Sequence, residues 1–185
     1  GIYAIADLFA QLFYTLILTP WAGSYLPYIM TRYKKHHDTM LTVEHENQKI
    51  MFLSMGTITG FLIISYLTCQ PITRFILPPS YHPAIPYIWV LLMSQVFLLG
   101  TYFSSSLLQY HKRNLFLALA LFIPALCNIL LNLILIPSFG ISGCAGAILI
   151  SYVIYFMLTL GYNKRIMTKV SNESHISHGA DTYKS

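Results

Sequence analysis

The sequence contains few charged residues. Eleven Lys and Arg and six Asp and Glu make up 9% of the 185 residues, whereas 56% are hydrophobic. Soluble domains carry about a quarter charged residues, so this composition excludes an ordinary water-soluble globule. The net charge of +5 does not indicate a nucleic-acid partner, because the cations form small clusters between long uncharged runs and no continuous basic face.

Cysteine is also scarce, and metal-ligand patterns are missing. The three cysteines, Cys69, Cys127 and Cys144, are odd in number and lie within or at the ends of hydrophobic runs, which excludes a disulfide framework or a zinc spacing. One acidic and His-rich segment has no His-x-x-x-His pair and no Cys partner; it comprises His36, His37, Asp38, Glu44, His45 and Glu46. We expect a solvated or interfacial connector there, with Met40, Leu41 and Val43 at the membrane surface, and no metal or cofactor.

The sequence does contain long uncharged runs. Residues 8–31 and 50–73 form runs of 24, residues 75–111 a run of 37, and residues 114–163 a run of 50. A membrane-spanning helix needs roughly 20 apolar residues, and the last run is interrupted by a Pro- and Gly-rich turn at 137–143. The prediction is an all-α polytopic membrane bundle, residues 1–163, with helices at about 4–30, 50–70, 86–109, 115–136 and 143–162, followed by a tail at 164–185.

The cations predict an orientation. If the first helix runs inward, Arg74 alone lies outside and the other ten Lys and Arg lie on the cytoplasmic side. Anionic membrane lipids are then the expected neighbours, and the C-terminus is cytoplasmic. Because the chain starts without Met and would enter from the outer side, we expect it to be part of a longer protein.

Catalytic groups are missing where an enzyme would need them. The predicted outer segments, 71–85 and 137–142, contain no Asp or Glu to act as a general base or metal ligand. No Ser/His/Asp or Cys/His grouping and no Gly-rich phosphate loop replaces them. We therefore expect a protein that is not an enzyme.

Polar residues inside the predicted helices are the candidate site, because such groups are costly in a membrane. The first helix carries Asp7 and Gln11. The third carries a heptad stripe of Gln95, Tyr102 and Gln109, and the fourth carries Asn128 and Asn132 on one face. Each set is open to two interpretations, which are hydrogen bonding between helices and lining of a translocation cavity.

Small residues and prolines predict where helices pack closely and where they bend. Gly143, Ala147 and Ser151 recur at four-residue spacing and predict close helix packing. Pro20, Gly23 and Pro27 interrupt the first helix, and Pro124 lies in the middle of the fourth, so bent helices are expected.

Together these motifs carry a resemblance. The order Asn128-x-x-x-Asn132, Ile136-Pro137, Gly140-x-x-Gly143, Ser151-Tyr152 resembles the signature of polysaccharide-unit flippases of the multidrug/oligosaccharidyl-lipid/polysaccharide transporter superfamily. Gly1-x-Tyr3 is similar to the segment before the eighth helix of that family, and residues 89–102 are similar to its tenth helix. The five spans would then match helices eight to twelve of twelve.

The resemblance implies a function and partners. The substrate would be an undecaprenyl-diphosphate-linked oligosaccharide, flipped across a bacterial inner membrane by alternating access for cell-surface polysaccharide biosynthesis. Lumen cations would come from an N-terminal half, and a glycan polymerase and glycosyltransferases are further expected partners. Two alternatives remain: a drug/cation antiporter of the same superfamily, whose acid only Asp7 could supply, and a non-transporting scaffold for glycan enzymes.

Overall fold

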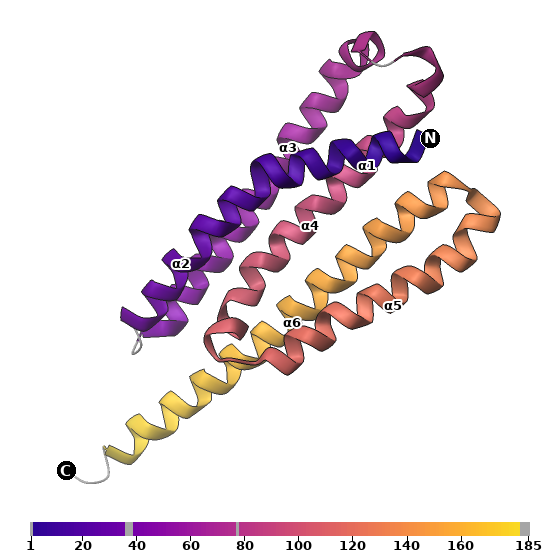
Figure 1. Cartoon of the computed structure of the whole chain (residues 1–185). Coiled ribbons are helices and arrows are strands. Elements are labelled where there is room, and N and C mark those ends of the chain that lie inside the picture. The colour runs from indigo at the N-terminus through magenta and orange to yellow at the C-terminus, as the bar shows by residue number, and fades with distance from the viewer. Residues whose placement is uncertain (1, 36–38, 77, 182–185) are drawn as a thin grey trace.

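The computed structural model describes residues 2–35, 39–76 and 78–181, and within those ranges the chain folds into helices without a strand (Figure 1). Five segments are long and apolar enough to cross a membrane: Tyr3–Lys35, Met40–Thr68, Pro79–Tyr110, Asn114–Phe139 and Ile141–Lys169. The predicted all-α bundle with five membrane-spanning helices is therefore confirmed, and the chain has the character of a membrane protein.

The first span is bent. It consists of α1 (Ile2–Phe13), a π-helical turn η1 (Tyr14–Leu18) and α2 (Thr19–Lys35), and Figure 1 shows α1 inclined to α2. The amide of Thr19 donates to the carbonyl of Tyr14, five residues earlier. Pro20, which follows, has no N–H, and its ring would collide with the carbonyl of residue 16 in a regular helix. The wider π turn accommodates it and produces the bend.

The remaining spans are long helices. These are α3 (Met40–Ile76), α4 (Ile85–Tyr110), α5 (Asn114–Phe139) and α6 (Ile141–Asp181), with a short 3₁₀ helix η3 (Pro79–Ala84) before α4. Gly140 separates α5 from α6 and adopts φ 57°, a left-handed conformation that a residue without Cβ accepts at little cost. The predicted turn at 137–143 is thus concentrated at Gly140, since Pro137 still lies inside α5.

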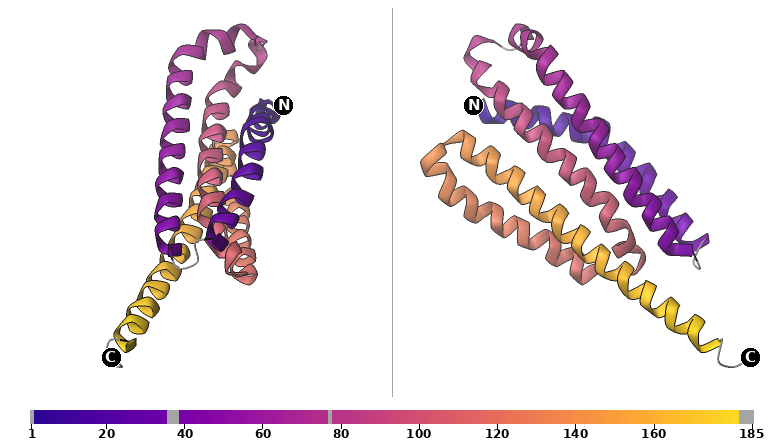
Figure 2. Two further views of the ribbon diagram at one scale, coloured as in Figure 1. Left: turned by 90° about the vertical axis from the view of Figure 1, so that its left-hand side faces the viewer. Right: turned by 180° about the vertical axis from the view of Figure 1, so that it is seen from behind.

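Helix α4 is the centre of the bundle. It is 56% buried along its apolar window, against 11–28% for the other four spans. Three layers of core side chains follow one another along it, around Leu91, Leu99 and Leu107. Figure 2 shows α3 and α6 beside α4, with α5 packed outside as the partner of α6.

The predicted connector between the first two spans is wrong in part. Helix α3 begins at Met40 and not near residue 50, so residues 40–49 are helical. Met40 and Val43 are buried against Ile29, Tyr33 and Leu107, and they do not lie on a surface. Over this stretch one face of the helix is buried, and it carries Glu44 and Asn47 as well as Met40 and Val43. An average of hydropathy does not reveal which face is buried. His36, His37 and Asp38 lie outside the described residues.

Candidate functional site

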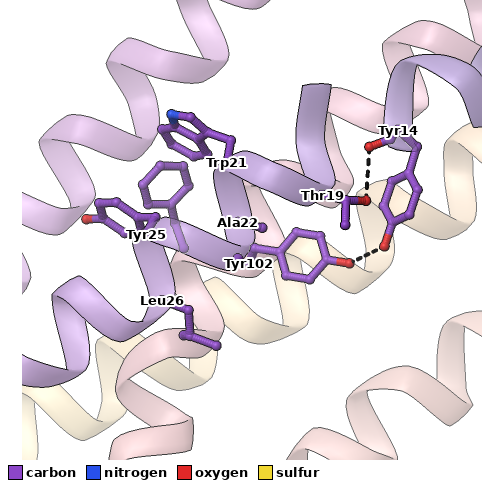
Figure 3. A pocket seen from close by; sticks show the side chains of 9 residues that line it. Tyr14, Thr19, Trp21, Ala22, Tyr25, Leu26 and Tyr102 are labelled. Atoms are coloured by element: carbon purple, nitrogen blue, oxygen red, sulfur yellow. Dashed lines mark hydrogen bonds between the residues drawn. The ribbon is translucent and has the colours of Figure 1, made fainter. Parts of the chain in front are cut away.

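Four tyrosines lie near one another where η1, α4 and α6 meet. Tyr14 in η1 and Tyr102 in α4 share a hydrogen bond of 2.7 Å between their hydroxyl oxygens (Figure 3). Tyr152 and Tyr155 of α6 lie near Tyr102. We call these four residues, Tyr14, Tyr102, Tyr152 and Tyr155, the tyrosine face. It gathers from three elements hydroxyl groups that can both donate and accept hydrogen bonds.

The polar pair of α1 lies next to this face. Gln11 donates to the carboxylate of Asp7 at 2.6 Å, one turn away. Asp7 lies near Tyr152 of α6. Sequence reasoning found Asp7, Gln11 and Tyr102, and the fold places both Asp7 and Tyr102 near Tyr152. It missed Tyr14, Tyr152 and Tyr155, because tyrosines spread over an apolar sequence give no periodic signal.

The asparagines of α5 extend the site on the other flank. Asn132 donates to the side-chain oxygen of Asn128 at 3.0 Å, within the same helix. A pocket of about 460 Å³ between α5 and α6 is lined by Asn128 together with Tyr152 and Tyr155. The site thus reaches from α1 to α5, and whether it lines a cavity stays a prediction.

The three residues of the heptad stripe of α4 lie in different surroundings. Tyr102 and Gln109 are half-buried, and Gln109 donates to the Ser105 hydroxyl at 3.2 Å. Gln95 is only 8% exposed, and its side-chain carbonyl oxygen has no hydrogen-bond partner. An unpaired buried carbonyl is costly, so Gln95 gives the bundle little of the stability expected of a tie between helices.

Three aromatic rings form a second feature beside Tyr102. Trp21 and Tyr25 of α2 are stacked, with ring centroids 5.4 Å apart and planes inclined by 5°. Phe103 of α4 meets Trp21 edge-on at 4.8 Å. Between these rings and the pair of Tyr14 and Tyr102 lies a pocket of about 250 Å³ (Figure 3), which we call the aromatic pocket.

A buried carboxylate lies near the end of the bundle where Lys and Arg gather. This end, the basic end, carries Arg32, Lys34, Lys35, Lys49, Lys112, Arg113, Lys164 and Arg165. Glu44 of α3 is 0% exposed. It accepts hydrogen bonds from the Tyr33 hydroxyl, from Asn163 at 2.7 Å and from Asn47 at 3.0 Å.

The carboxylate joins four helices. Tyr33 belongs to α2 and Asn163 to α6, while Asn47 also donates to the Ser106 hydroxyl of α4 at 3.3 Å. We call Tyr33, Glu44, Asn47, Ser106 and Asn163 the Glu44 cluster. The groups that donate to Glu44 in these bonds are uncharged hydroxyl and amide groups. Arg32, the nearby cation, pairs with the more exposed Glu46 at 2.7 Å.

The expectation that only Asp7 could supply an acid within the bundle is therefore wrong. Sequence reasoning placed Glu44 in a connector, because its partner Asn163 is 119 residues away and no local pattern reports that contact. The one local signal was the spacing of Glu44 and Asn47, which share a helix face.

Small residues allow close helix contacts at two places. A Cβ on Gly143 would collide with the carbonyl of Leu135 across the α5–α6 turn. Ala147 is fully buried, and the Ser151 hydroxyl donates to the carbonyl of Ala147 at 2.7 Å. On α4, a Cβ on Gly100 would lie 2.7 Å from the Met55 sulfur and from the ring of Phe156. Gly143 thus lies where α5 and α6 approach each other, and Ser151 borders the pocket between them.

The ranges that the structure describes hold no group of three or more His, Cys, Asp or Glu that could bind a metal ion. No protein-family model, no curated protein and no solved structure matches the chain.

Proposed function

We propose that the chain is one lobe of a flippase that moves an undecaprenyl-diphosphate-linked oligosaccharide across a bacterial inner membrane. The observation that carries this proposal is the tyrosine face. Sugars present hydroxyl groups that donate and accept, and the phenol hydroxyls of Tyr102 and Tyr152 offer the same two capacities within an otherwise apolar bundle. Uncharged contacts of this kind bind a sugar without holding it tightly, which suits a substrate that must move on.

The distribution of charge supports an orientation of the lobe with its basic end in the cytoplasm. With the basic end in the cytoplasm, the turn at Gly140 and the loop around Ser80 face outward. No Lys or Arg lies in the middle of a span, so cations that would neutralise the diphosphate belong to a preceding half of the transporter. Glycosyltransferases and a glycan polymerase are the partners that would supply and consume such a substrate.

The Glu44 cluster supports movement of the lobe as one body. Alternating access in transporters of this kind is largely a rocking of rigid halves around a central site. Hydrogen bonds from α2, α3 and α6 meet at one buried carboxylate, and α4 joins through Ser106. Four helices fixed at one end would rotate together and would carry the tyrosine face with them.

The test is flipping of a fluorescent lipid-linked oligosaccharide in liposomes by the transporter that contains this lobe. Accessibility of the glycan to an impermeant oxidant reports the transfer. We expect the double variant Tyr102→Phe, Tyr152→Phe to flip several-fold more slowly at normal abundance. The control is Tyr162→Phe, whose ring stacks on Phe116 outside the tyrosine face at 3.7 Å. Equal rates for all three proteins would contradict the proposal, and no flipping by any would favour the scaffold.

One observation favours a second candidate, a drug/cation antiporter. Such a transporter needs an acid within its helices, and Glu44 is a fully buried one. If the chain acts in this way, uptake of tetraphenylphosphonium against an imposed ion gradient would be lost in Glu44→Gln and kept in Glu46→Gln. Glycan flipping without such uptake would exclude this candidate.

A further inference from the structure

The aromatic pocket is a concave site that the sequence analysis did not single out. It is lined on one side by Trp21 and Tyr25 of α2 and on the other by Tyr14 and Tyr102. Its volume of about 250 Å³ lies just below the roughly 300–1,000 Å³ of typical small-molecule sites, so it suits a single ring better than a chain of sugars.

The rings of the pocket are held in place before any ligand arrives. Trp21 is fixed by stacking on Tyr25 and by its edge contact with Phe103, and Tyr25 contacts Phe103 at 4.6 Å. Trp21 is nevertheless 37% exposed, so part of its surface is open to a ligand. Aromatic faces carry partial negative charge and attract the polarised C–H groups on the flat side of a sugar ring. A fixed, partly open indole is therefore a prepared stacking surface.

Hydroxyl groups lie at the other wall. The pair of Tyr14 and Tyr102 uses one hydroxyl hydrogen in its own bond, which leaves one hydrogen and several lone pairs for a ligand. Thr19 borders the same pocket and donates to the backbone carbonyl of Tyr14 at 3.1 Å. The π-helical turn η1 places Tyr14 there, and π turns inside helices are frequent at functional sites.

The chemistry of these walls differs from that of a lipid-facing surface. The exposed face of α5 is largely aliphatic, with Leu115, Leu133 and Ile134 among its most exposed side chains, and its exposed rings, Phe122 and Phe139, carry no hydroxyl. The aromatic pocket instead combines rings with hydroxyls, and Tyr102 makes it continuous with the tyrosine face. A ligand with both C–H faces and hydroxyls matches that combination, whereas an acyl chain does not.

We propose that the aromatic pocket is a subsite for one pyranose ring of a glycan, stacked on Trp21 and hydrogen-bonded to Tyr14 and Tyr102. This inference rests on the proposed function, because it assigns the sugar to the lipid-linked substrate.

Gly23 offers a way to fill the pocket without disturbing the fold. It borders the pocket, and a Cβ at this position would meet no atom within 4 Å. Gly60 of α3 is the matched control, because its Cβ would also meet nothing within 4 Å and it does not border the aromatic pocket. Both glycines lie inside helices, where Leu is the better helix former, so neither substitution should weaken the helix.

The experiment uses Trp21 as its own reporter. The chain has two tryptophans, so Trp89→Phe leaves Trp21 as the single emitter in lipid nanodiscs. We expect chitobiose or maltose to change its emission saturably and sorbitol to have no such effect. Gly23→Leu should weaken saccharide binding about tenfold, the loss of roughly one aromatic contact, and Gly60→Leu should not. Gly23→Ala, a smaller insertion, should give an intermediate loss.

The outcomes separate the subsite from the proposed function. Absence of a saturable change, or equal saccharide binding by the Gly23→Leu and Gly60→Leu variants, would overturn the subsite. So would saturable binding of undecaprenyl phosphate or tetraphenylphosphonium that Gly23→Leu blocks while neither saccharide binds. Saccharide binding by a transporter that does not flip lipid-linked glycan would leave the subsite standing and refute the function. Normal flipping by the Gly23→Leu variant would refute the subsite and leave the proposed function standing.

Discussion

Single residues decide how stable this bundle is at its basic end. Glu44 is a buried carboxylate that unites hydrogen-bond donors from α2, α3 and α6. Burying such a group is costly unless its bonds are complete, and breaking a completed set leaves other polar groups unpaired. Asn163 is the most vulnerable partner, because its side-chain oxygen already has no hydrogen-bond partner.

The first prediction follows from this arrangement. Glu44→Ala should lower the free energy of unfolding by about 2–3 kcal/mol, because the buried amide of Asn163 loses its acceptor. Glu46→Ala should cost about 0.5 kcal/mol or less, since Glu46 forms only a more exposed ion pair. Unfolding in SDS mixed micelles, followed by circular dichroism, measures both.

A double variant tests whether the unpaired amide of Asn163 causes this loss of stability. Glu44→Leu with Asn163→Leu removes both members of the buried pair and should be more stable than Glu44→Leu alone. An equal loss in Glu44→Ala and Glu46→Ala would show that the cluster contributes no more than a surface ion pair.

Helix packing explains what the sequence predicted and what it missed at the scale of elements. Gaps between charges predicted five spans, because the length of an apolar run reflects the thickness of a bilayer. The start of α3 was missed, since Glu44 and Asn47 interrupt the apolar run although they are buried. The hydrogen bond of Tyr102 to Tyr14 depended on which helices meet, and local spacing does not contain that information.

The second prediction concerns the contact of α4 with its neighbours at Gly100. Gly100→Val should destabilise the bundle by about 1–3 kcal/mol, because its side chain meets the buried ring of Phe156 and the sulfur of Met55. Gly56→Val on α3 is the control, where a Cβ meets nothing within 4 Å. SDS unfolding compares the two, and similar stability would contradict the close approach of these helices.

The cations predict the orientation of the whole molecule in the membrane. In a cysteine-free background, we predict that single cysteines at Ser80 and Ser138 react with an impermeant thiol reagent from outside intact cells. A cysteine at Thr168, which is exposed beyond the basic end, should react only after permeabilisation. Reaction of Thr168→Cys in intact cells, with Ser80→Cys protected, would reverse the orientation.

The two sides of α5 provide the last prediction. Leu133 is 69% exposed and faces away from the bundle, while Asn128 borders the pocket shared with Tyr152. The hydrogen bond of Asn132 to Asn128 lies within α5, so in this structure it does not connect two helices. Losing it should cost about 0.6 kcal/mol, the average for such bonds in membranes, and two leucines would favour insertion.

We therefore predict that Asn128→Leu with Asn132→Leu leaves abundance and SDS unfolding nearly unchanged but slows flipping of the lipid-linked oligosaccharide several-fold. Leu133→Ala on the opposite face should leave flipping unchanged. If the asparagines act as ties between helices, the double variant should lose folded protein and flipping in the same proportion. Separating the two readouts decides between a cavity wall and a structural contact, because only the cavity wall affects the rate per folded molecule.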